Sequence, residues 1–428
     1  MRSRFSGTGR IFSASIRAAV CAFFLFCAAN SSPAADDGSM SPSRPSASVR
    51  VFTAADAVFY GIRNNQQILV ANEDVEIAKA KIRETHALVF PKIDFNLNAS
   101  KYDTATPFIL SDALGSIYYD ASRAPSENYT AKFTMAQYIY AGGRYTSNMR
   151  LAKTNLRVAE TNREILLSNV RAEVKKAFYR LIYASARLSD MKKEAARLSS
   201  GGRSADGELL AALRRDIISA EKNYAAARLG FLSTAGLELN TIFEISGALK
   251  IDLPTALEAD KLVAQAYQYR RELSRVAIQE TIDSLAVSLL QTEKFPAVTL
   301  GGTYEFVDVN RSDSRKNWAM FLNLNLPVFD GWASWARLDA RKSHARQSGI
   351  KKTDAEDAIS YEVRLAVLTL EAAAKKVKHD EDRLAEALSA KPVNPRAVYL
   401  ASMDILDSRL EAVTSLINLE LAVGKEIS

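Results

Sequence analysis

The chain has 428 residues, of which 48% are hydrophobic and 25% are charged, and its formal charge is +7. This length suits one large domain or two ordinary ones. Both cysteines, Cys21 and Cys27, fall within the first 35 residues. The rest of the chain can therefore form neither a disulfide nor a thiolate metal site.

Residues 1–35 have the pattern of a secretory signal peptide: four arginines, a short apolar run and the small-residue sequence SSPAA. We expect cleavage after Ala34 or Ala35, and no lipid on Cys27, because the bulky Phe26 before it does not suit a lipobox. Cleavage removes four arginines and no acid, which leaves 7 − 4 = +3. We therefore predict no nucleic-acid partner. Residues 36–50 are rich in Ser and Pro and are predicted to be a flexible linker.

Residues 51–253 are predicted to form a first structural repeat. Its predicted elements are a helix at 53–90, strands at about 92–102 and 129–139, a long helix at 144–200 and a returning helix at 204–237. The strands alternate apolar and polar residues, and Pro91 separates the first helix from the first strand. The long helix contains neither Gly nor Pro and carries apolar residues at alternating steps of three and four, as in a coiled coil.

Residues 254–428 are predicted to repeat this order. Ile68 and Phe90-Pro91 recur as Leu273 and Phe295-Pro296 at an offset of 205 residues. The predicted elements are a helix that begins at Pro254, strands at about 297–307 and 318–327, a long helix that ends near Ala390 and a returning helix at 398–425. Each half thus reads helix, strand, strand, long helix, helix.

The four strands predict how the chain enters a membrane. No apolar run after the signal approaches 18 residues, so entry into a bilayer would require a barrel. Four strands cannot close a barrel, so we predict an oligomer. Five aromatic residues at the strand ends suit a girdle at the lipid surface, with the packing of a soluble core as the alternative. They are Trp332, Trp335, Tyr138, Tyr140 and Tyr145.

The sequence gives no support to an enzyme. The only histidines, His86, His344 and His379, are scattered along predicted helices and make no HExxH pair. Neither a nucleophile elbow nor a phosphate-binding loop is present. We therefore predict no catalytic residue, no metal site and no cofactor.

Several motifs, each weak alone, recur in one order. They are Asn64–Ile68 (NNQQI), Phe90-Pro91, Gln137–Gly143 (QYIYAGG), Leu326–Gly331 (LPVFDG) and Asp404–Asp407 (DILD). In these motifs, and over nearly all of its mature length, the chain resembles the TolC-like outer-membrane factor, or outer-membrane efflux protein, family.

The resemblance implies a mostly α fold with a transmembrane β-barrel. Three chains would build a twelve-stranded barrel in the cell outer membrane, and their helices a coiled-coil tunnel in the periplasm. Such a homotrimer is the passive exit duct of a tripartite efflux or type I secretion system, for small molecules or proteins. Its partners would be outer-membrane lipid, a periplasmic adaptor and an inner-membrane pump of RND or ABC type. The alternative is a soluble periplasmic coiled-coil tether without a pore, which would need no lipid-facing strands.

The resemblance also implies a pore constriction. Asp404 and Asp407 are spaced i, i+3 and share a helix face, which is more often simply solvated. Their match to the family's constriction aspartates implies a ring of carboxylates that attracts cations. Glu208 holds the analogous place in the first half. The helical tips at Gly201–Gly207 and Ala397–Ala401 depart from the Val-Gly-x motif that the family often carries there.

Overall fold

The computed structural model describes residues 50–101, 109–112, 115–118, 127–200, 206–249, 257–309, 313–390, 392 and 394–427. The chain divides into two units, Met1–Arg50 and Val51–Ser428, and the fold below is that of the second. The predicted signal peptide, all but the last residue of the predicted linker, and Pro254 lie outside the described residues.

The described elements confirm the predicted order of helices and main strands, and they add four short strands that were not predicted. The first half contains β1 (Arg50–Phe52), α2 (Ala54–Asn64), α3 (Gln66–Ala87), β2 (Lys92–Lys101), β3 (Ile109–Asp112), β4 (Gly115–Tyr118), β5 (Glu127–Ala141), α4 (Arg144–Ser200), α5 (Asp206–Thr234) and β6 (Phe243–Ile245). The second half contains α6 (Ala259–Tyr269), α7 (Arg271–Thr292), β7 (Ala297–Val309), β8 (Asp313–Asn325), α8 (Ala333–Ser389) and α9 (Pro395–Val423). Helices α4 and α8 each have 57 residues, and α5 and α9 each have 29. These equal lengths support an internal duplication.

The first helix of each half is broken, contrary to the prediction of one helix over 53–90. Asn65 separates α2 from α3 with φ −64° and ψ 123°, and Arg270 separates α6 from α7 with φ −71° and ψ 120°. The Asn65 side chain accepts a hydrogen bond from the N–H of Gln67 at 2.9 Å, which caps the start of α3. Such a local side-chain bond competes with the helix, and it leaves no Gly or Pro signal in the sequence.

The main sheet has the strand order β2-β5-β7-β8, and all three pairings are antiparallel. Directly paired residues share a face of a sheet. Phe95, Phe133, Tyr304 and Trp318 are paired in turn across the four strands, so they lie on one face. The same face carries Ile93, Leu97, Met135, Leu300, Met320, Leu322 and Leu324. The sheet therefore has one mainly apolar face, on which Gln137 and Lys316 are polar exceptions toward the two ends of the strands.

The opposite face of the sheet is mainly polar. It carries Asn96, Asn98, Thr130, Lys132, Thr134, Thr303, Glu305 and Asn323. Phe321 breaks the alternation of β8, and its partner across the sheet is Gly301. A Cβ on Gly301 would lie 2.2 Å from the Phe321 ring. The absence of a side chain at Gly301 thus makes room for the Phe321 ring on the polar face.

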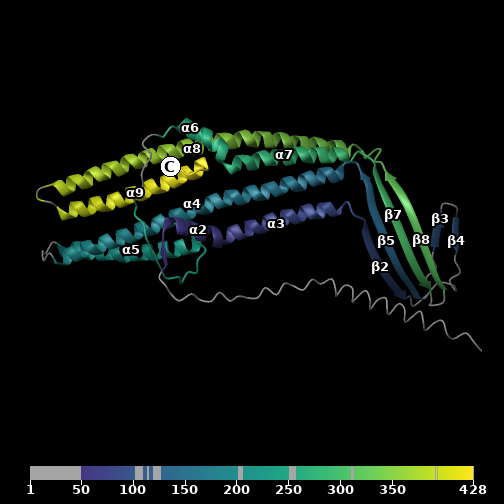
Figure 1. The fold of residues 1–428 in the computed structure, drawn as a ribbon, viewed down its shortest axis with the longest axis horizontal. Helices are drawn as coiled ribbons and strands as arrows, with labels where there is room; N and C mark the ends of the chain where they lie inside the picture. The colour runs from purple at the N-terminus through teal and green to yellow at the C-terminus, as the bar shows by residue number, and fades with distance from the viewer. Residues whose placement is uncertain are drawn as a thin grey trace, which may run out of the picture. The chain divides into compact units, whose positions relative to one another are not determined.

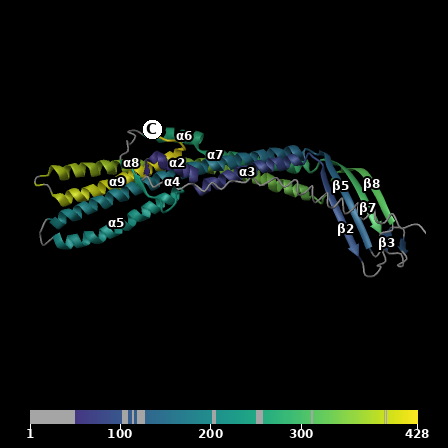
Figure 2. The same cartoon turned by 60° about the horizontal axis from the view of Figure 1, so that its bottom comes forward.

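Helices α3, α4, α7 and α8 run from the sheet, and α5 and α9 lie beside the far parts of α4 and α8 (Figures 1 and 2). Residues of the predicted seams are buried, including Val170, Val174 and Leu181 on α4 and Val363 and Leu370 on α8. A core cluster around Phe178, Phe231 and Val413 joins α2, α4, α5 and α9. Among the described helices, none is long and apolar enough to cross a membrane.

Candidate functional site

The predicted constriction residues Asp404 and Asp407 lie on α9, and both carboxylates are ion-paired. The Asp404 carboxylate lies 3.0 Å from the Arg383 guanidinium on α8, and the Asp407 carboxylate lies 2.8 Å from that of Arg187 on α4. The side chains of the two aspartates remain 47% exposed. Each aspartate is thus half-exposed and also ion-paired with an arginine on another helix. The sequence predicted only that the two aspartates face water.

Asp407 is the centre of a three-residue cluster that joins α9 to α4. Tyr183 and Arg187 lie one helical turn apart on α4; Tyr183 donates a hydrogen bond to the Asp407 carboxylate, and Arg187 donates to both. Burial raises the pKa of the Tyr183 hydroxyl, and its bond to Asp407 raises it further. Burial alone would lower the pKa of Arg187, but Tyr183 and Asp407 raise it. Tyr183 therefore stays protonated, and Arg187 charged, at neutral pH.

Further ion pairs hold α8 and α9 together as one hairpin. Lys376 pairs with Glu411 at 2.7 Å, and Arg409 pairs with Glu381 at 2.9 Å. These side chains are partly exposed, so each pair contributes only about 0 to 1 kcal/mol. The Asp407 cluster crosses from this hairpin to α4 instead. It adds to the apolar core and to the Lys175–Glu420 ion pair, which also join α4 to α9.

Sequence reasoning missed Tyr183, Arg187 and Arg383. The available signal was the spacing of Tyr183 and Arg187 at i, i+4, which is also common on solvated helix faces. Glu208 lies near the start of α5 and is exposed. It is on the other hairpin from Asp404, and its predicted place at a constriction stays a prediction.

The five predicted girdle residues gather where the sheet meets the helices. Tyr138 and Tyr140 are near the end of β5, Tyr145 is near the start of α4, and Trp332 and Trp335 flank the start of α8. Trp335 is 52% exposed, and the Lys294 ammonium lies 3.7 Å from its ring centroid. Tyr145 is partly buried, and its hydroxyl lies 3.1 Å from Nδ1 of His86.

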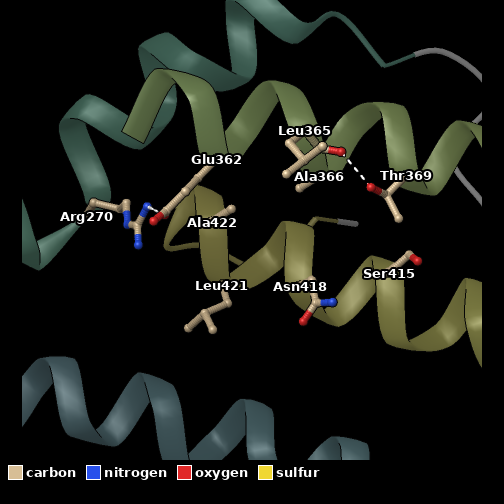
Figure 3. Close-up of a pocket in the computed structure, with 9 residues that line it drawn as sticks. All are labelled: Arg270, Glu362, Leu365, Ala366, Thr369, Ser415, Asn418, Leu421 and Ala422. Carbon is tan, nitrogen blue, oxygen red and sulfur yellow. Dashed lines mark hydrogen bonds and ion pairs between the residues drawn. The ribbon is translucent and has the colours of Figure 1, made fainter. Parts of the chain in front are cut away.

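A groove of about 260 Å³ lies beside α8 and α9 (Figure 3). Arg270, at the break between α6 and α7, enters it and bonds Glu362 on α8. Thr369, Ser415 and Asn418 add polar atoms, and Thr369 bonds its own helix at the carbonyl of Leu365. The contact between Arg270 and Glu362 thus anchors the break between α6 and α7 to α8. Among the described residues, no group of His, Cys, Asp or Glu could hold a metal ion.

Residues 62–206 match the model of a protein family described as "outer membrane efflux protein". A comparison with curated proteins found no match. Solved structures with the same fold include a membrane protein from Pseudomonas aeruginosa, with TM-score 0.70, 15% identity, and 87% of this chain and 93% of that chain covered.

Two further similar structures are outer membrane channels. The CmeC channel of Campylobacter jejuni has TM-score 0.67 and 14% identity over 87% of this chain and 85% of that chain. The open state of the MtrE channel of Neisseria gonorrhoeae has TM-score 0.62 and 17% identity over 87% of this chain and 89% of that chain. At these identities the likeness concerns the fold.

Proposed function

This chain carries the domain of the outer membrane efflux protein family, and on that premise we propose that it is the outer-membrane exit channel of an efflux system. The observation that carries this proposal is the sheet. It has one mainly apolar face, a mainly polar opposite face and two edge strands, β2 and β8. A lipid-facing barrel wall needs this pattern, and a soluble tether does not.

Oligomerisation would complete the channel. Edge strands expose unpaired N–H and C=O groups, which must be satisfied inside a bilayer. Pairing β8 of one copy with β2 of the next satisfies them, and three copies with four strands each give 3 × 4 = 12 strands. The polar face of the sheet would then line the lumen. Of the five aromatic residues at the helix end of the sheet, Tyr138 pairs with Thr299 on the polar face, and the other four would form the girdle.

The same fold suggests the partners of the channel. Its far end is a set of helical hairpins, which would receive a periplasmic adaptor that connects to an inner-membrane pump of RND or ABC type. The channel has no energy source of its own in this scheme, so the pump would drive transport and choose the cargo. Small molecules fit the family's efflux function, and export of proteins by a type I system is the second possibility.

Membrane location and assembly can be tested together. We expect the mature chain to fractionate with the outer membrane and to give a three-chain species on crosslinking in native membranes. The purified trimer should conduct ions in a planar bilayer. A monodisperse soluble monomer in the periplasm would instead support the tether.

The Asp407 cluster is proposed to hold the channel closed at its periplasmic end. Replacing Asp407 with asparagine removes the charge that Arg187 pairs with. Each partly exposed pair contributes about 0 to 1 kcal/mol, so three copies acting together should raise the ratio of open to closed channels by as much as about a hundredfold. Single-channel recording measures this ratio directly.

The double variant Asp404→Asn with Asp407→Asn should also weaken cation selectivity, because it removes the carboxylates from the proposed constriction. The matched control is Asp354→Asn with Asp357→Asn, an exposed pair with the same spacing on α8. The control should leave selectivity and opening unchanged. Unchanged selectivity in a normal trimer of the Asp404 and Asp407 variant would place these aspartates outside the pore.

A further inference from the structure

The two long helices carry the same pair of cations at the same place. Lys153 and Arg157 follow the first residue of α4 by 153 − 144 = 9 and 157 − 144 = 13 residues. Lys342 and Arg346 follow the first residue of α8 by 342 − 333 = 9 and 346 − 333 = 13 residues. All four residues are exposed. The duplicated halves thus share a basic i, i+4 pair, which we name the basic pair of each helix.

Each basic pair costs the helix free energy, because like charges at i, i+4 repel. In the part of the chain that the structure describes, no carboxylate lies within ion-pairing distance of Lys153 or Arg157. Lys342 has only a long contact of 3.8 Å with Asp339, and Arg346 donates to the Ser343 hydroxyl at 2.8 Å. By contrast, Lys192 and Lys193, farther along α4, have carboxylates at 2.8 and 2.9 Å. The basic pairs are therefore open to an anion from outside the chain.

The basic pair of α8 shares a helix face with Trp335. At about 100° per residue, Lys342 and Arg346 lie about 20° to either side of Trp335, two and three turns further along. Trp335 is half-exposed and already has the Lys294 ammonium against its ring. An exposed apolar segment formed by Val328, Phe329 and Trp332 leads from β8 to this face. The exposed apolar segment, the indole ring of Trp335 and the two cations thus follow one another along the chain. This order is expected where a chain passes from the hydrocarbon of a membrane through its interface to the lipid headgroups.

We propose that the basic pairs bind the headgroups of anionic phospholipids in the leaflet that faces the helices. This rests on the proposed function, since it needs the sheet to lie in a bilayer. The pairs lie about 14 to 20 Å along each helix from its first residue. Long Lys and Arg side chains shorten that distance by extending toward the interface. The Arg guanidinium fits two phosphate oxygens, and the Lys ammonium adds a point charge.

The test uses the trimer purified from outer membranes and reconstituted in vesicles of phosphatidylcholine, with or without phosphatidylglycerol. Native mass spectrometry counts the lipids that each trimer retains. We expect the wild type to retain phosphatidylglycerol preferentially, and Lys342→Gln with Arg346→Gln to lower that preference about fivefold per cation removed. Lys153→Gln with Arg157→Gln should act alike. The effect should shrink at high salt, because salt screens exposed charges.

The matched control is Lys375→Gln with Lys378→Gln, which removes two exposed cations of the same helix far from the sheet. It should leave lipid preference unchanged. Equal lipid retention by the wild type and all variants, in trimers that insert normally, would overturn this inference alone. A wild type that inserts into neither vesicle would overturn the proposed function and this inference with it. Two other results of the basic-pair variants, each with unchanged lipid preference, would also overturn it. Altered ion selectivity would place the pairs in the lumen, and lost binding to isolated cell-wall polymer would assign them to that polymer.

Discussion

Replacing Phe231 with alanine should lower the free energy of unfolding by about 3 to 5 kcal/mol. The ring is fully buried, and its centroid lies 5.3 Å from that of Phe243 and 6.1 Å from those of Phe52 and Phe178. Strands β1 and β6 form a separate two-stranded sheet, and truncation would leave a cavity where α5 meets α4 and this sheet. Thermal unfolding of the purified protein should show a large fall in the midpoint temperature.

The control for this cavity is Phe231→Leu. Leucine keeps most of the apolar volume, so we expect it to cost about 1.5 kcal/mol or less. A midpoint for Phe231→Ala that equals that of the wild type would contradict the tight aromatic packing described here. A fall of equal size for both variants would show that the ring contacts, rather than the filled volume, stabilise this region.

Gly142→Ala should also destabilise the protein strongly. Gly142 turns the chain from β5 into α4 with φ 60°, and an added Cβ would lie 2.7 Å from Cβ of Phe295 and 3.0 Å from the carbonyl oxygen of Thr292. Left-handed backbone costs a residue with a Cβ about 1 to 2 kcal/mol, and the clash adds about 1 to 3 kcal/mol.

The neighbouring glycine provides the control for that clash. Gly143 has φ 85°, but the nearest atom to an added Cβ is 3.7 Å away, in the Thr292 side chain. Gly143→Ala should therefore cost only the backbone strain. The two variants should differ clearly in the heat resistance of the trimer on gels. Equal heat resistance would mean that the junction yields to the extra methyl group without cost.

Hydrophobic periodicity was enough to predict the sheet and the long helices. The apolar residues of β8 recur at every second position, and those of α4 at steps of three and four, so each element could be assigned from its own residues. The breaks at Asn65 and Arg270 could not be found this way. They depend on one side-chain bond and on tertiary packing, neither of which changes the apolar pattern around them.

The candidate site was predicted only in part. The sequence singled out Asp404 and Asp407 through a family resemblance, and it could not name their partners. Arg187 and Asp407 are 407 − 187 = 220 residues apart, and they meet only because two long helices take one particular rotation and register. The apolar face of the sheet could be predicted from less information. The two-residue period already assigns each side chain to one face of its strand, and strand pairing then aligns these faces across the sheet.

The pairing of β5 with β7 also sets an order for folding. This pairing joins residues that are between 297 − 141 = 156 and 309 − 128 = 181 positions apart, whereas the helices of each hairpin follow one another directly in the chain. Contacts between distant residues close slowly, because the loss of chain entropy comes before the gain from pairing. The hairpins should therefore form first and the sheet last. Until β2 and β8 pair with other copies, the unassembled chain would expose two sheet edges and would be prone to aggregate. In the last step of maturation, correct assembly therefore competes with misassembly.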